Sequence, residues 1–90
     1  MAQLPPDVQA YKKTSIFTEQ TVPAGLLSDH QTKAGVWGLI SVVSGSLQYN
    51  VPSRDVSDLL GDGDTGVIEP TVTHSVTPQG PVSFYVEFYR

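Results

Sequence analysis

The stretch VSFYVEFY, residues 82–89, carries the clearest secondary-structure signal in the chain. Val82, Phe84, Val86 and Phe88 alternate with serine, tyrosine and glutamate, which is the two-residue period of a β-strand. The pattern predicts a strand with two different faces, one apolar and one mixed.

Upstream of this strand, GVWGLISVV (35–43), SGS (44–46) and LQYNV (47–51) follow one another directly. Gly45 can adopt the positive φ that a tight turn requires. The pattern therefore predicts a hairpin of two strands joined at Gly45.

Helix signals are weak and turn signals are frequent. Only DVSDLL, residues 55–60, has apolar spacing with an acidic start, and its length allows at most a turn or two. Segments such as GDGDTG (61–66) and PQGP (78–81) break the chain at short intervals. We predict an all-β fold with little helix, arranged as a sandwich or a closed barrel.

The 90 residues predict a single domain, 1–90, in which residues 1–10 form an extended N-terminal segment. A chain of this length buries only about 60–65% of its unfolded surface and builds one modest core. The absence of cysteine excludes disulfides, thiolate metal sites and cysteine nucleophiles.

Charge and hydropathy exclude two kinds of partner. Five basic residues stand against nine acidic ones, and the basic ones are scattered, so we expect no nucleic-acid partner. No apolar run approaches the roughly 20 residues that span a bilayer, and Met1 to Asp7 carries no basic region before an apolar run. We expect a cytoplasmic protein with no membrane partner.

Four segments together resemble the TehB/YeaR-like family, small cupins associated with tellurite resistance. They are VPAGLLSDHQTKAGVWG (22–38), VVSGSLQY (42–49), GVIEPTVTHSV (66–76) and VSFYVEFYR (82–90). The resemblance implies a cupin-like double-stranded β-helix, or jelly roll, whose two sheets close around a pocket.

Cupins in general hold a divalent metal with histidines from two motifs and a carboxylate. By this resemblance, His30 is the first histidine of the first motif, and Thr32 stands where the second would be. Gly66, Pro70 and His74 match the order of the second motif. The resemblance thus implies a metal site reduced to His30 and His74, with zinc or nickel as the expected ion.

Two carboxylates could complete such a site, because borderline cations take three or more imidazole and carboxylate ligands. Glu69 and Glu87 are the glutamates in apolar, strand-like surroundings. Glu87 shares a strand face with Tyr85 and Tyr89, which could line the pocket. Lys33 is the alternative counterion of Glu87, and that ion pair would replace the metal.

The expected ligand pocket contains Thr32, Lys33, Trp37 and Tyr85. The simpler interpretation makes Trp37 and the tyrosines core or pocket wall, and Glu69 an exposed carboxylate before a turn. Both interpretations remain open at this level.

Two hypotheses of function follow. The first is a small metal- or small-ligand-binding cupin in a response to tellurite, another oxyanion or a related stress, in which binding or sensing is favoured over catalysis. The second is a non-catalytic structural module that pairs with itself or with a partner enzyme such as a methyltransferase. We expect a homodimer, because a symmetric pair covers the edge strands of a small sheet.

Overall fold

The computed structural model describes residues 3–28 and 30–90, and in this part the protein is all-β. One antiparallel sheet of six strands contains all the regular β-structure, and two single-turn 3-10 helices interrupt it. The elements are β1 (Ala10–Lys13), β2 (Phe17–Thr18), η1 (Ala24–Leu27), β3 (Trp37–Val51), η2 (Pro52–Arg54), β4 (Val56–Leu60), β5 (Thr65–Ile68) and β6 (Ser75–Tyr89). Residues 3–9 of the predicted N-terminal segment belong to no helix or strand, and residues 1–2 lie outside the described part.

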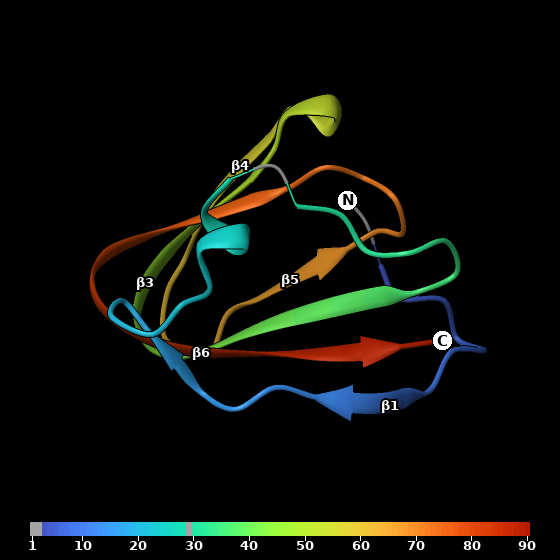
Figure 1. Cartoon of the computed structure of the whole chain (residues 1–90), viewed down its shortest axis with the longest axis horizontal. Coiled ribbons are helices and arrows are strands. Elements are labelled where there is room, and N and C mark those ends of the chain that lie inside the picture. The colour runs from blue at the N-terminus through green and yellow to red at the C-terminus, as the bar shows by residue number, and fades with distance from the viewer. Residues whose placement is uncertain (1–2, 29) are drawn as a thin grey trace.

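The two 15-residue strands β3 and β6 form the centre of the sheet. They pair antiparallel along their length, from Trp37 opposite Tyr89 to Asn50 opposite Ser75. β1 and β2 flank β6, while β4 and β5 flank β3 on either side of its middle. Figure 1 shows β3 and β6 curving round together, so that the sheet folds over its own inner face.

The predicted hairpin at Gly45 is wrong, because β3 continues through this residue and stays paired with β6. The positive φ of Gly45, 85°, serves a bend, and the register shifts on both sides of it. The expected turn at 78–81 also lies inside β6, with Gly80 at φ 83°. A glycine with positive φ fits a β-bulge as well as a turn. The glycines at 45 and 80 therefore indicate a special backbone conformation, but here that conformation bends a strand and does not reverse the chain.

The weak helix signal at 55–60 is also wrong. Asp55 adopts a left-handed conformation after η2, and the residues that follow form β4, paired with β3 from Val51–Val56 to Leu47–Leu60. The pairing along the sheet outweighs a propensity that six residues can only weakly express. By contrast, the predicted turn in GDGDTG does separate β4 from β5.

The core lies on the inner face of the folded sheet. In VSFYVEFY, Val82, Phe84 and Val86 are buried, as the alternation predicted. The remaining buried apolar residues are Ile40, Val42, Leu47, Tyr49, Val51, Leu60, Ile68 and Val76. No helix in residues 3–28 and 30–90 is long and apolar enough to cross a membrane.

A short backbone contact closes the fold at one end. His30 and His74 form an isolated antiparallel bridge, with N–H to carbonyl distances of 2.9 and 2.8 Å. Next to it, the Thr71 N–H donates to the Thr32 carbonyl over 3.1 Å. These bonds join the segment before β3 to the segment before β6, and they bring two distant histidines together.

Candidate ligand-binding site

The two histidines of the chain contact each other through their side chains as well as their backbones. His30 Nδ1 lies 3.2 Å from His74 Nε2, and the rings meet edge to face with centroids 5.1 Å apart. His74 is 1% exposed, whereas His30 is half-buried. The pair therefore runs from the core towards the surface.

The hydrogen bonds of the pair indicate the tautomer of a neutral His74. His74 Nδ1 lies 3.3 Å from the Val72 carbonyl, which can only accept, so Nδ1 carries the hydrogen in this contact. His74 Nε2 is then an acceptor, and His30 Nδ1 donates to it. Burial lowers the pKa of His74, the bond to Val72 raises it, and His30 lowers it again, with burial the largest cause. His74 is accordingly a neutral imidazole at pH 7.

Both histidines line a cavity of about 200 Å³ that is partly open to solvent and almost wholly apolar. Its walls come from β2, η1, β5 and β6 and from the loops between them. The lining residues are Thr14, Phe17, Pro23, Gly25, Leu26, His30, Thr32, Ile68, His74, Val86 and Phe88. A cavity of this size and character suits a small, mostly apolar molecule.

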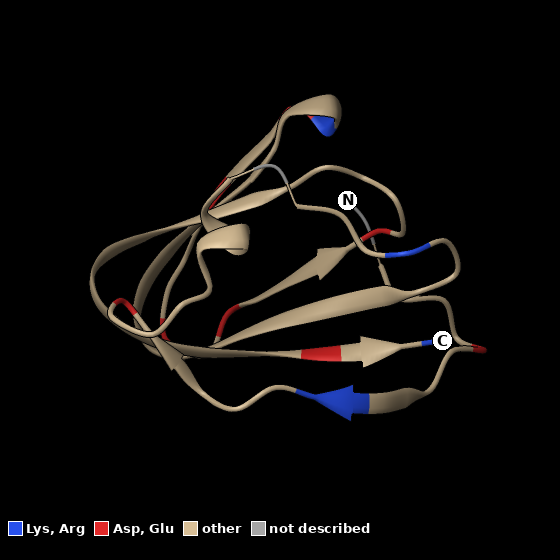
Figure 2. Cartoon of the chain, viewed as in Figure 1, with Lys and Arg blue, Asp and Glu red and all other residues tan. Residues whose placement is uncertain are grey.

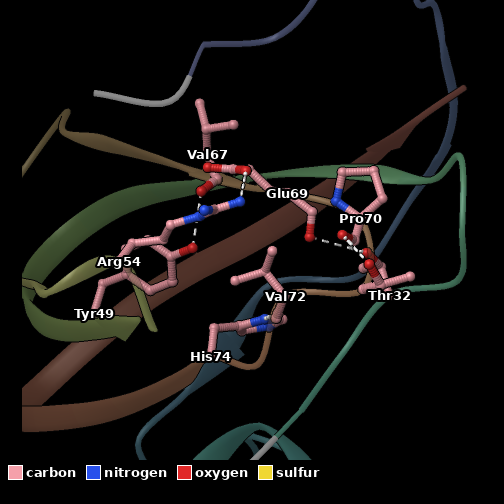
Figure 3. Close-up of polar contacts among 9 residues, drawn as sticks. Thr32, Tyr49, Arg54, Val67, Glu69, Pro70, Val72 and His74 are labelled. Carbon is pink, nitrogen blue, oxygen red and sulfur yellow. Dashed lines mark hydrogen bonds and ion pairs between the residues drawn. The ribbon is translucent and has the colours of Figure 1, made fainter. Parts of the chain in front are cut away.

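Thr32, which the sequence placed in the ligand pocket, is a buried residue of this cavity wall. Its hydroxyl lies 2.8 Å from the Val36 carbonyl and 3.5 Å from the Glu69 carbonyl, as Figure 3 shows in part. The hydroxyl hydrogen is therefore engaged by the protein backbone.

The structure does not bring Trp37, Tyr85 and Glu87 to the histidines. Tyr85 and Glu87 lie on the outer face of the sheet, because their neighbours Phe84, Val86 and Phe88 face inward. Trp37 shares that face, since it lies opposite Tyr89 in the β3–β6 ladder. Glu87 pairs in register with Lys13, and the Lys13 ammonium lies 4.3 Å from the Tyr85 ring centre. Figure 2 shows this acidic segment of β6 beside the basic segment of β1.

Glu69 and Lys33 are also placed away from the histidine pair. The Glu69 carboxylate forms an ion pair with Arg54 at 3.0 Å (Figure 3). Lys33 is exposed in the turn before β3, and in the described part of the chain it forms no ion pair with Glu87. Of the expected site residues, the structure brings together His30, Thr32 and His74.

The pair has the spacing of two metal ligands, although the set of donors is incomplete. Two nitrogens on one tetrahedral zinc at about 2.0–2.1 Å lie roughly 3.3 Å apart, close to the 3.2 Å between His30 and His74. Within residues 3–28 and 30–90, however, no group of three or more histidine, cysteine, aspartate or glutamate side chains is placed to hold an ion. Two donors are fewer than the three protein ligands of catalytic zinc sites, so these residues do not by themselves fit a resident metal.

A second, larger hollow of about 710 Å³ lies beside β4 and η2. At its floor the Tyr49 hydroxyl donates to the Val67 carbonyl over 2.8 Å, and a Cβ on Gly66 would lie 3.1 Å from the Tyr49 ring. Burial, with smaller contributions from Glu69 and Asp58, raises the pKa of Tyr49 well above its usual value. This tyrosine is therefore a fixed, neutral part of the wall.

The fold and the site together define a small all-β domain with a paired-histidine cavity. The model of the TehB-like domain matches residues 12–86, and the chain belongs to this family. A search of curated proteins gave no match.

Three solved bacterial structures illustrate the similarity of fold. A protein of Escherichia coli K12 superimposes with a TM-score of 0.87 at 26% identity, covering 100% of this chain and 97% of its own. TehB from Haemophilus influenzae gives 0.82 at 21% identity, covering 93% of this chain and 32% of its own. A protein of Neisseria meningitidis gives 0.59 at 12% identity, covering 98% of this chain and 87% of its own. This chain thus spans about a third of the TehB chain and nearly all of the Escherichia coli protein.

Several cavity residues were missed in the sequence. Phe17, Leu26, Ile68 and Phe88 belong to the apolar wall. For Phe88 the signal was present, since it belongs to the apolar face of VSFYVEFY. Phe17 and Leu26 lie in β2 and η1, which have two and four residues and are too short to show a period, so only the three-dimensional structure identifies them.

Proposed function

We propose that this chain is a small-ligand-binding domain with a cupin-like jelly-roll barrel, and that its ligand occupies the cavity beside His30 and His74. The observation that carries the proposal is the hydrogen-bonded histidine pair in the wall of an otherwise apolar cavity. Polar groups in such surroundings commonly orient a ligand, while the apolar walls supply most of the affinity.

Binding or sensing is a better match to this site than catalysis. The lining side chains include no carboxylate, lysine or arginine among the described residues, so general acid-base chemistry would depend on the histidines alone. The resemblance to tellurite-resistance proteins supports a role in the response to that oxyanion or a related stress. The apolar wall favours a neutral ligand for the cavity itself over the charged oxyanion.

Filling the cavity tests this proposal. Leu26→Trp should abolish small-molecule binding, because the indole would occupy the space beside the histidines. Leu27→Trp is the matched control: it neighbours Leu26 in η1 but is exposed and does not line the cavity. Binding is measured by a small-molecule library screen with NMR chemical shifts. Equal binding by both variants would reject the cavity as the site.

A partner-binding role is the second candidate, supported by the coverage of two of the solved structures. The same fold makes up nearly all of one solved chain and about a third of another. A domain found alone and within a longer chain is suited to act beside a partner enzyme, for which a methyltransferase is the first candidate. Co-purification of this chain with a defined enzyme, unaffected by Leu26→Trp, would favour this function over ligand binding.

A further inference from the structure

We propose that the ligand of this cavity is a small neutral ring compound that carries a hydrogen-bond donor, of which phenol is the simplest. This inference rests on the proposed ligand-binding function and names the chemical class that the site selects. The hydrogen atoms that the lining side chains already donate within the protein decide which ligand groups the cavity can still satisfy.

The histidine pair presents an acceptor. The chain of hydrogen bonds runs from His30 Nδ1 to His74 Nε2 and from His74 Nδ1 to the Val72 carbonyl. With one hydrogen on each imidazole ring, both ring hydrogens are thereby used, and His30 Nε2 keeps a lone pair. In the described part of the chain no hydrogen bond reaches this nitrogen, and no buried side-chain nitrogen or oxygen lacks a partner. His30 Nε2 is therefore accessible to a ligand or to water.

The two lining hydroxyls offer no donor either. Thr14 Oγ1 donates to the Ser15 carbonyl over 2.8 Å and accepts the Val86 N–H over 3.0 Å. Thr32 Oγ1 directs its hydrogen to the Val36 carbonyl over 2.8 Å. Among residues 3–28 and 30–90, the side chains that line the cavity thus supply acceptors and no uncommitted donor. An anion, which needs donors or cations around it, would be left unsatisfied there.

The dimensions of the cavity indicate one ring. An apolar cavity of about 150 Å³ is known to hold benzene, so about 200 Å³ accommodates a ring with one substituent. Phe17 and Phe88 line the same space and offer edge-to-face contacts to an aromatic ligand. A ring whose hydroxyl donates to His30 Nε2 satisfies both the apolar wall and the free acceptor.

The test compares four probes of similar size on the full chain at pH 7.5: phenol, anisole, toluene and benzoate. Net hydrogen-bond energies predict that phenol binds roughly 3- to 10-fold more tightly than anisole or toluene. Benzoate should bind most weakly. Phenol should also shift the ¹⁵N resonance of His30 Nε2, which a purely structural histidine would not show.

His30→Phe keeps a ring in the wall and removes the acceptor, so it should equalise phenol and toluene. Gln31→Ala is the control, since Gln31 is exposed and does not line the cavity. Equal binding of phenol and toluene by the unmodified protein, or tightest binding of benzoate, would overturn this inference and leave the ligand cavity intact. If no probe binds, and Leu26→Trp and the unmodified chain also give the same result in the library screen, both this inference and the proposed ligand-binding function are overturned.

Discussion

His74 joins the core to the candidate site, because it is almost fully buried and also contacts His30. Charging a buried imidazole removes a cation from water, and the described side chains that line its cavity include no carboxylate to offset that cost. Its Tyr49 neighbour, with ring centres 6.2 Å apart, is likewise neutral at ordinary pH because its pKa is raised.

The first prediction concerns pH. The pKa of His74 is lowered in the folded state, so below about 6.5 the unfolded chain binds more protons than the folded one. The free energy of unfolding should therefore fall as pH drops from 6.5 towards the folded pKa. Urea titrations between pH 5.5 and 7.5 measure this slope, and His74→Phe, which cannot titrate, should flatten it. If His74→Phe shows the same dependence of the free energy of unfolding on pH, groups other than His74 cause it.

The second prediction concerns metal. His30 and His74 supply two donors, so added zinc or nickel should bind weakly, and dialysis should remove it without changing the melting temperature. Elemental analysis of protein purified without an affinity tag or chelator checks this, beside the His30→Ala, His74→Ala double variant. One tightly held equivalent in the unmodified protein, absent from the folded double variant, would instead restore the metal site that the family resemblance implies.

The sequence predicted part of this site. The resemblance identified His30, Thr32 and His74, which are 44 residues apart at the extremes. The strand pattern did not place Glu87, because the apolar face of VSFYVEFY predicts a core while the face shared by Tyr85, Glu87 and Tyr89 was equally compatible with a pocket wall. The choice is made by packing: Phe84 and Val86 meet the core, and Glu87 remains beside β1.

Among the elements, the central strand β3 differs most from the expectation. The alternation on either side of Gly45 correctly predicts strand, and the glycine correctly predicts a residue with positive φ. Whether a positive-φ glycine reverses a chain or only bends it depends on the partner strand, and that partner, β6, lies far away in sequence.

The third prediction tests the bend. A Cβ on Gly45 would overlap the Pro81 carbonyl oxygen and lie 2.8 Å from Val82 Cα, besides requiring an unfavourable φ. Gly45→Ala should lower the free energy of unfolding by about 2 kcal/mol or more. Gly63→Ala has a similar φ, 81°, with open space around its Cβ, and should cost about 1 kcal/mol. Chemical denaturation measures both, and equal losses would show that the contact with β6 contributes nothing.

For the whole molecule, the free edge of β4 is the feature with the clearest consequence. In the described part of the chain β4 pairs only with β3, and its Leu59 is 59% exposed. Figure 1 shows that β4 and η2 project from the rest of the sheet. An unpaired edge with an exposed leucine is suited to a second copy of the chain.

The fourth prediction is therefore a homodimer formed through β4. Light scattering at micromolar concentration should give about twice the 9.7 kDa of the chain. Leu59→Lys should return the mass to that of a monomer, because a charge at this edge opposes pairing. Leu27→Lys, at an exposed leucine of η1, should leave the dimer intact. A monomeric unmodified protein would contradict the prediction.

The long ladder between β3 and β6 also determines when the site can form. Its nearest partners in sequence, Asn50 and Ser75, are 25 residues apart, whereas Val51 and Val56 of the β3–β4 hairpin are five residues apart. Loop-closure entropy favours early formation of that hairpin and late closure of the ladder and of the His30–His74 bridge. Contacts that form after the folding transition state mainly affect the unfolding rate. A ligand in the cavity should accordingly prolong the lifetime of the folded chain while leaving its rate of folding almost unchanged.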